Sequence, residues 1–342
     1  MTGLATGVGT APCHHGEILQ GAFRDGGGRV CAALVTLPLP GGSGLGSRAE
    51  FTPRADAPPG RITVLPADRT KASRAAALAV EECARRTQRP VYGGRLRLGG
   101  GVPIGLGMGS SSSDVIAAVR AVAASYGIQL PPTAVARLAV RAESACDPLM
   151  LDGRPVLFAQ REGRVLETLG AALPPAVVVG CATGGGRPVD TLALQGAAHR
   201  EADLRAFERL RALLRRAVGT GDAALLGEVC TESALRHQRL LPKEELPALR
   251  AVAAEVGAVG VQVAHSGNVA GIVFDPATPD LRGRLRRCVR ALAREGTPAA
   301  RAFRTTTPPS HERPSDHVRP RGRRDRRPGS DTARRGSGVP AL

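Results

Sequence analysis

The stretch between Gly99 and Tyr126 constrains the fold of this chain more than any other. It contains three glycines that alternate with apolar residues and then four serines: Gly105, Gly107 and Gly109, followed by Ser110, Ser111, Ser112 and Ser113. Glycine tolerates positive φ angles and lets a ligand approach the backbone closely, and serine is a favoured helix N-cap. Apolar residues then recur at helical spacing from Val115 to Ala123. The pattern predicts a strand, a loop and a serine-capped helix whose N-terminus would stabilise phosphate, unless the loop is an ordinary glycine-rich turn.

Two widespread phosphate-binding loops do not fit this stretch. A Walker A loop needs a Lys before its final Ser or Thr, and no Lys stands near these serines. The dinucleotide fingerprint has the spacing G-x-G-x-x-G, whereas Gly105, Gly107 and Gly109 give G-x-G-x-G. The loop therefore belongs to a different class of phosphate site.

The net charge of +17 raises the alternative of a nucleic-acid-binding protein, because Lys and Arg neutralise phosphates. Residues 305–342 contain nine Arg and four acidic residues and so contribute +5 of that charge. The other basic residues are interleaved with Leu and Glu, as on solvated amphipathic helices. No aromatic RNA-binding motif or zinc-finger spacing accompanies them, so the composition disfavours a nucleic-acid partner.

Seven cysteines are scattered along the chain and never form C-x-x-C, which is typical of a reducing compartment. The N-terminus has no basic start followed by an apolar run, and no segment approaches about 18 consecutive apolar residues. These features favour a cytoplasmic protein without a membrane partner.

The order of the predicted elements favours an α+β protein with two domains and a tail. We expect an N-terminal domain over residues 1–171, a C-terminal domain over 172–304 and a basic tail of disordered composition over 305–342. Further local predictions are a turn at Gly16 and Glu17, a strand from Val30 to Pro38, and a helix from Ala134 to Ala145 capped by Thr133.

Two carboxylates near the end of that helix are candidates for chemistry. Glu143 and Asp147 are four residues apart, a spacing that puts both side chains on one side of a helix end. Phosphoryl transfer needs a hard cation with oxygen ligands and a group that orients or deprotonates the acceptor hydroxyl. The alternative is structural: Glu143 would pair with Arg137 or Arg141, and Asp147 would only end the helix.

The loop from Pro103 to Ser113 resembles P-x-G-x-G-L-G-S-S-A-A of the GHMP kinases, which phosphorylate small molecules. The resemblance implies a domain like that of ribosomal protein S5, a ferredoxin-like domain, and ATP with Mg²⁺ between them. It assigns nucleotide binding to the loop, Mg²⁺ to Ser111 and Glu143, and catalysis to Glu143 and to Asp147 as the base or acceptor-orienting group. The loop residues so assigned are Pro103, Gly105, Gly107, Gly109, Ser110, Ser111 and Ser112. Several family members have P-S-G-x-D before this Asp, whereas residues 144–146 here are Ser, Ala and Cys.

The residues from Thr10 to Gly21 resemble the C-x-G-E-x-x-Q-G start of the L-threonine kinases that feed cobalamin side-chain assembly, and Ala264 to Gly271 resembles their third motif. This resemblance implies an acceptor site that includes His15, Glu17, Gln20 and Ser266. The adjacency of Cys13, His14 and His15 disfavours a metal site there, because adjacent residues are not spaced for one tetrahedron.

The predicted function is ATP-dependent phosphorylation of a hydroxyl on a small molecule, with L-threonine or a related amino acid as the acceptor. A homoserine-type or sugar kinase and a catalytically silent nucleotide-binding relative stay open as alternatives. A homodimer is also left open.

Overall fold

The computed structural model describes residues 5–39, 45–100, 108–184, 200–297 and 299–305. Residues 1–308 form one compact unit, in which twelve strands are arranged in two sheets among the described residues. Pro103, Gly105 and Gly107 of the predicted phosphate loop lie outside the described residues, as does the tail beyond Thr305.

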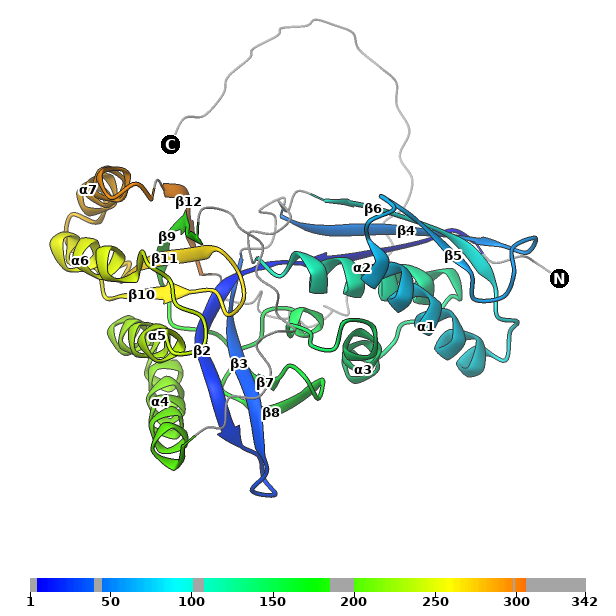
Figure 1. The fold of residues 1–342 in the computed structure, drawn as a ribbon, viewed down its shortest axis with the longest axis horizontal. Helices are drawn as coiled ribbons and strands as arrows, with labels where there is room; N and C mark the ends of the chain where they lie inside the picture. Colours follow the sequence, from blue (N-terminus) through cyan, green and yellow to red (C-terminus); the bar gives the residue numbers. More distant parts are fainter. Residues whose placement is uncertain (1–4, 40–44, 101–107, 185–199, 298, 306–342) are drawn as a thin grey trace, which may run out of the picture. The chain divides into compact units, whose positions relative to one another are not determined.

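The first half of the chain contains eight strands, three helices and a short 3₁₀ turn (Figure 1). The strands are β1 (Gly7–Pro12), β2 (His14–Arg24), β3 (Val30–Pro38), β4 (Gly46–Arg54), β5 (Ile62–Leu65), β6 (Gly93–Gly100), β7 (Val156–Ala159) and β8 (Arg164–Thr168). The helices are α1 (Thr70–Thr87), α2 (Ser110–Ser125) and α3 (Pro132–Glu143), followed by η1 (Leu149–Leu151).

The described part of the second half contributes four strands and four helices. The strands are β9 (Val177–Ala182), β10 (Gly260–Val263), β11 (Val269–Phe274) and β12 (Ala299–Arg304). The helices are α4 (Glu201–Thr220), α5 (Ala223–His237), α6 (Leu246–Val256) and α7 (Leu281–Arg294). The α+β class expected from the sequence is confirmed by these elements and by the solved structures described below.

Helix α2 packs very closely on the four-stranded sheet, whose strand order is β1-β4-β6-β5. Two glycines of β1 make this approach possible: a Cβ at Gly7 would lie 2.1 Å from the carbonyl oxygen of Ala121, and one at Gly9 would lie 2.3 Å from that of Ala117. Alanine and valine side chains of α2 fill the interface with α1, α3 and the sheet. The small residues of β1 and α2 thus allow the helix to lie directly on the sheet.

The eight-stranded sheet joins the two halves of the chain, with the order β12-β9-β11-β10-β2-β3-β7-β8. The joint lies between β10 and β2, where Val263 is the register partner of Glu17. This pairing brings the turn between β10 and β11 beside the N-terminal motif, although some 250 residues separate them in the sequence. Helices α6 and α7 pack against β9, β10 and β11 through a separate apolar cluster.

Three local predictions differ from the structure. The predicted turn at Gly16 and Glu17 is wrong, because β2 runs through both residues with an irregular register opposite β3 and a φ of 68° at Gly16. Thr133 does not cap α3, which begins one residue earlier after Pro131. Strand β12 was not predicted, whereas β3 has the predicted bounds.

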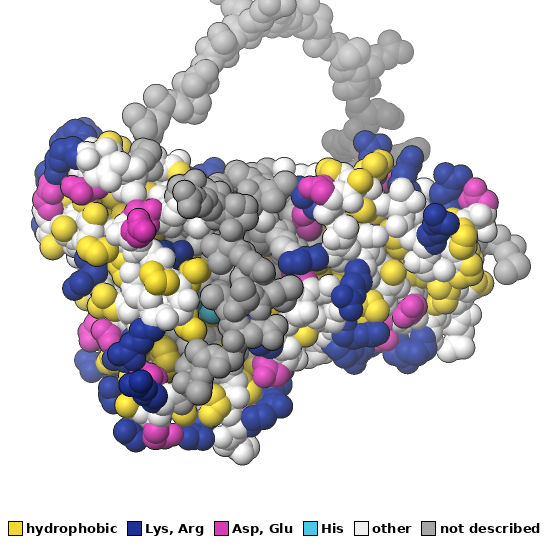
Figure 2. Space-filling view, viewed as in Figure 1, with side chains coloured by type: hydrophobic (Ala, Val, Ile, Leu, Met, Phe, Trp, Pro, Cys, Tyr) yellow, Lys and Arg dark blue, Asp and Glu magenta, His cyan; other side chains and the backbone are white. Residues whose placement is uncertain are grey.

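Basic and acidic side chains are interspersed on the face shown in Figure 2, with Lys and Arg spread over both halves of the compact unit. This distribution agrees with the expectation of solvated amphipathic faces. Among the described residues, no helix combines the length and apolar character needed to cross a membrane.

Candidate active site

The N-terminus of α2 forms one wall of the site. Gly109 is the N-cap residue, with a φ of 70°, and no side chain caps the helix. The predicted serine cap is therefore wrong: Ser110, Ser111 and Ser112 form the first helical turn instead. Their backbone N–H groups are among those that an α-helix leaves without an internal partner, so the helix end can receive an anion.

Glu143 lies opposite this first turn, at the end of α3. Its Oε2 accepts a hydrogen bond from Ser111 Oγ at 2.7 Å, and its Oε1 accepts one from Ser112 Oγ at 2.9 Å. Burial raises the pKa of Glu143 to about 7, although the two hydroxyls and the charge of Lys71 oppose that rise. Three of the predicted residues, Ser111, Ser112 and Glu143, are thus brought together.

This donor set fits a hard cation. Glu143 and Ser111 offer only oxygen atoms, which Mg²⁺ prefers, and a cation would offset the desolvation that raises the carboxylate's pKa. The predicted ion pairs of Glu143 with Arg137 or Arg141 are absent from the described contacts, in which Arg137 pairs with Glu82 instead.

A cavity of about 200 Å³ opens beside the start of α2. Its lining joins the N-terminus of α1 to the first turn of α2: Asp68, Arg69, Thr70, Lys71, Ala72, Ser110, Ser111 and Asp114. The sequence analysis did not identify Lys71 or Arg69, because no motif marks them and they precede the loop by more than thirty residues. Arg69 is paired with Asp68 and Asp114, so Lys71 supplies the positive charge that suits a polyanion at the helix end.

His14 connects the helix end to Asp147. Its backbone N–H donates to the carbonyl oxygen of Met108 at 3.2 Å, and its Nε2 lies 3.0 Å from Asp147 Oδ2. Its other ring nitrogen, Nδ1, lies 3.2 Å from the carbonyl oxygen of Gly16. Both ring nitrogens face acceptors, so the arrangement is satisfied when each carries a proton, which is the imidazolium form.

The charges of this cluster support that assignment. Burial lowers the pKa of His14, but the charge and hydrogen bond of Asp147, with Glu17 and the Gly16 carbonyl, outweigh it and raise the pKa to about 9. Burial works to raise the pKa of Asp147, yet the charge and hydrogen bond of His14 leave it below its usual range. Asp147 is therefore an ionised carboxylate held in place by a buried cation.

Ligand atoms of His14, Glu17 and Asp147 all lie within 4.8 Å of one another, a grouping that a metal could use. The geometry favours an ion-pair cluster instead, because the two nitrogens of His14 are directed at different acceptors and both act as donors. Glu17 Oε1 lies 3.7 Å from His14 Nδ1, on the side opposite Asp147.

The raised pKa of His14 predicts a pH-dependent contribution to stability. A group whose pKa is higher in the folded state stabilises it fully below its unfolded pKa, near 6.5, and loses that contribution as the pH rises through about 9. Urea titrations of the wild type and of His14→Gln give the difference between their free energies of unfolding. We expect this difference to decrease as the pH is raised from about 6.5 to about 9. Parallel stability curves for the two proteins would contradict the imidazolium assignment.

Glu17 and Gln20 lie on β2 and hold the turn between β10 and β11. The Glu17 carboxylate accepts the backbone N–H of His265 through Oε2, and Gln20 Oε1 lies 2.7 Å from Nδ1 of His265. Gln20 Nε2 donates to the carbonyl oxygen of Val263 at 3.3 Å. Burial raises the pKa of Glu17 to about 7. The side chains of both residues thus bind the turn, and their assignment to the acceptor site stays a prediction.

Two buried basic residues, His237 and Lys243, hydrogen-bond to carbonyl oxygens of the same turn. His237 Nε2 donates to the carbonyl oxygen of His265 at 2.6 Å, and the two imidazole rings lie 5.0 Å apart between centroids. Lys243 Nζ donates to the carbonyl oxygen of Gly267 at 2.6 Å. Burial lowers the pKa of both groups, that of His237 to about 3.

The other two predicted acceptor residues are placed differently. His15 is buried away from His14, with its Nδ1 3.1 Å from Gln262 Oε1 and its ring beside Phe303. Ser266 is half-buried at the tip of the β10–β11 turn, next to His265. The structure therefore gathers Ser110–Ser112, Glu143, Asp147, Glu17 and Gln20 in one region, whereas His15 packs into the sheet.

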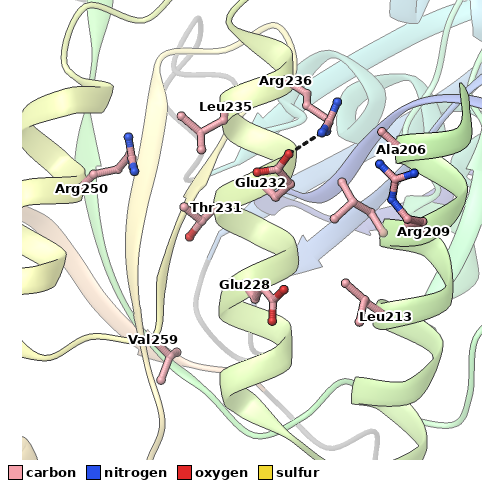
Figure 3. Close-up of a pocket in the computed structure, with 11 residues that line it drawn as sticks. Ala206, Arg209, Leu213, Glu228, Thr231, Glu232, Leu235, Arg236, Arg250 and Val259 are labelled. Atoms are coloured by element: carbon pink, nitrogen blue, oxygen red, sulfur yellow. Dashed lines mark ion pairs between the residues drawn. The ribbon is translucent and has the colours of Figure 1, made fainter. Parts of the chain in front are cut away.

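A second, larger groove of about 640 Å³ lies elsewhere, over α5 between α4 and α6 (Figure 3). Arg209 and Leu213 reach it from α4, Arg250 from α6, and Glu232 pairs with Arg236 at 2.6 Å on its floor. None of the residues that line it belongs to the cluster at the N-terminus of α2.

The fold described above is similar to that of the GHMP kinases. Residues 72–149 match the family described as GHMP kinases N terminal domain, which confirms the resemblance seen in the motifs. Homoserine kinase from Cytophaga hutchinsonii has a similar structure, with a TM-score of 0.61 over 88% of this chain and 95% of that one. The two sequences are 16% identical, so the likeness concerns the fold.

The chain is also similar to two curated L-threonine kinases. It is 29% identical to the one from Salmonella typhimurium over 201 residues, which cover 54% of this chain and 62% of that protein. It is 29% identical to the one from Citrobacter freundii over 183 residues, which cover 51% of this chain and 60% of that protein. The match thus spans less than two thirds of either relative.

Proposed function

We propose that this protein is an ATP-dependent kinase that transfers phosphate to a hydroxyl of L-threonine or a related amino acid. One observation carries the proposal: two carboxylates lie close to the N-terminus of α2. Glu143 accepts hydrogen bonds from Ser111 and Ser112, and Asp147 is bound by His14. Glu143 and the two serines suit the nucleotide and its cation, and Asp147 with His14 suits the acceptor hydroxyl.

The nucleotide phosphates would lie at the start of α2. Backbone N–H groups of Ser110 to Ser112 and the helix dipole stabilise negative charge there, and Lys71 adds a cation at the edge of the cavity. Ser111 and Glu143 would hold Mg²⁺, which supplies neutralisation of the charge on the β- and γ-phosphates when it is bound. The family's use of ATP agrees with this assignment.

Asp147 would receive the acceptor hydroxyl. The hydroxyl oxygen forms a bond to the γ-phosphorus as the bond to the β–γ bridging oxygen breaks, and the hydroxyl proton leaves to Asp147 or to solvent. Since the transition state of phosphoryl transfer is loose, the oxygen needs orientation more than strong deprotonation. A carboxylate with a lowered pKa, fixed by His14, is suited to orient that hydroxyl.

The preference for an amino acid is supported by two lines of argument. The curated relatives are named L-threonine kinases, and the motif around Glu17 and Gln20 resembles theirs. The region beyond Asp147 is also rich in carboxylate and imidazole groups that can receive an ammonium.

The first prediction is turnover itself. Purified protein with Mg²⁺ and ATP should release ADP when L-threonine is added, and phosphorus NMR should show a new phosphate monoester. L-Serine, L-homoserine and galactose test the alternative acceptors, and a reaction with EDTA tests the need for a divalent cation. Folded protein that binds ATP yet turns over none of these alcohols would contradict the proposed function.

A further inference from the structure

The turn between β10 and β11 presents an imidazole whose backbone is bound on several sides. The N–H of His265 is held by Glu17, and its carbonyl oxygen accepts from His237 Nε2 at 2.6 Å. The ring is fixed as well, because Nδ1 lies 2.7 Å from Gln20 Oε1. Polar groups of β2 and α5 thus fix the position of this one side chain through hydrogen bonds.

These contacts define the tautomer of His265. Gln20 donates its Nε2 hydrogen to the Val263 carbonyl, which leaves Oε1 as the atom that faces the ring. An amide oxygen accepts and cannot donate, so Nδ1 of His265 must carry the hydrogen. In a neutral imidazole, Nε2 then carries a lone pair.

The surroundings keep this imidazole neutral and hold it in the cluster that contains Asp147. Burial lowers the pKa of His265 to about 4, and the nearby charges of Arg161 and Lys243 act in the same direction against Asp147. Glu17 links His265 to the Asp147 cluster, because its Oε2 accepts the N–H of His265 and its Oε1 lies 3.7 Å from Nδ1 of His14, whose Nε2 lies 3.0 Å from Asp147 Oδ2. Among the described residues, no hydrogen bond to Nε2 is formed.

We propose that Nε2 of His265 accepts a hydrogen bond from the ammonium group of the amino-acid acceptor and so determines specificity. A lone pair in a cluster where two carboxylates, Glu17 and Asp147, lie beside the single imidazolium of His14 favours a cationic donor. Glu17 and Gln20 are then positioning residues that act through His265. This inference rests on the proposed function.

Two variants distinguish the role of Nδ1 from that of Nε2 in His265. His265→Asn keeps an amide N–H near the place of Nδ1 and loses the acceptor at Nε2. His265→Gln puts an amide oxygen near the place of Nε2. Because a hydrogen bond to a charged group contributes about 1.5–3 kcal/mol, the KM for L-threonine should rise about 10- to 150-fold in His265→Asn. The rise should be smaller in His265→Gln, and the KM for ATP should change less than about twofold in both.

An acceptor that lacks the ammonium supplies the matched control. With 3-hydroxybutyrate, wild type and His265→Asn should have the same kcat/KM, because no ammonium contact is lost. An equal loss with both acceptors would overturn the inference, since it would show a structural role for His265. An unchanged KM for L-threonine in His265→Asn, in protein that phosphorylates threonine, would overturn it as well.

The tautomer can be checked without turnover. Nitrogen-15 NMR of the ligand-free wild type should show His265 Nε2 as an unprotonated ring nitrogen at neutral pH, and L-threonine with a non-hydrolysable ATP analogue should shift that signal. A protonated Nε2 would overturn the inference even if the kinase reaction is found. Absence of turnover with every alcohol would instead count against the proposed function.

Discussion

Replacing Asp147 by Asn is expected to lower kcat by about 10²- to 10⁴-fold, the range of a positioned acid–base group. The amide oxygen of Asn can still accept from His14 Nε2, so the geometry at 3.0 Å is retained while the negative charge is lost. The acceptor hydroxyl then loses the carboxylate that would orient it and receive its proton. Steady-state kinetics with saturating ATP and acceptor measure the effect.

The KM for ATP separates this role from a structural one. It should stay within about threefold of the wild-type value, because Asp147 lies on the acceptor side and the phosphates are bound by the start of α2. Asp152→Asn is the matched control: it makes the same chemical change five residues later, where the side chain is 76% exposed and pairs with Arg120 at 3.3 Å. The control should keep wild-type kcat. An Asp147→Asn protein with kcat within about threefold of wild type would rule out the proposed role of Asp147.

Periodic segments of the fold could be predicted from the sequence because local residues determine them. The strand from Val30 to Pro38 has the predicted bounds, and the helix predicted from apolar spacing after the serines is α2, which ends at Ser125. Strand β12 could not be found this way, because only Phe303 is buried and its partner β9 is more than a hundred residues away. Its pairing, and not its own pattern, makes it a strand.

The bulge at Gly16 shows why local signals can mislead. A glycine beside a charged residue is typical of a turn, and here the same positive φ leaves the strand continuous. A Cβ at Gly16 would lie 1.9 Å from Nε2 of Gln262, so the glycine also allows β10 to approach β2. This approach places Glu17 and Gln20 beside His265.

The candidate site likewise contains residues that a local motif identifies and residues whose role depends on distant partners. The loop and the pair Glu143 and Asp147 were found in the sequence because each lies in one short motif. The roles of His14 and His265 could not be settled from the sequence, since a histidine acquires its role from its partners, and those partners are 133 and 245 residues away. The same holds for the serines: their spacing predicted a cap, but α3 supplies Glu143, and the hydroxyls turn toward it.

Gly109→Ala is expected to lower kcat/KM by about a hundredfold or more, because misplacing catalytic groups by about 1 Å has effects of this size. A Cβ at Gly109 would lie 2.5 Å from Cδ2 and 2.6 Å from Nε2 of His14, and 3.3 Å from Oδ2 of Asp147. The methyl group must displace the imidazole or the helix N-terminus, so both the acceptor carboxylate and the phosphate site are disturbed at once. Initial rates over a grid of ATP and acceptor concentrations measure the loss.

The other end of the same helix provides the control that makes this prediction sharp. Gly127 follows α2 with a φ of 73°, nearly that of Gly109 at 70°, and a Cβ there would have no atom within 4 Å. Both substitutions should lower the free energy of unfolding by about 1–2 kcal/mol through the strain of a left-handed alanine, and Gly109→Ala should lower it further because its methyl group displaces His14. Only Gly109→Ala should lose activity. If both folded variants have the same kcat/KM, the close packing of Gly109 on His14 has no part in the reaction. The link between the N-terminus of α2 and Asp147 is then refuted.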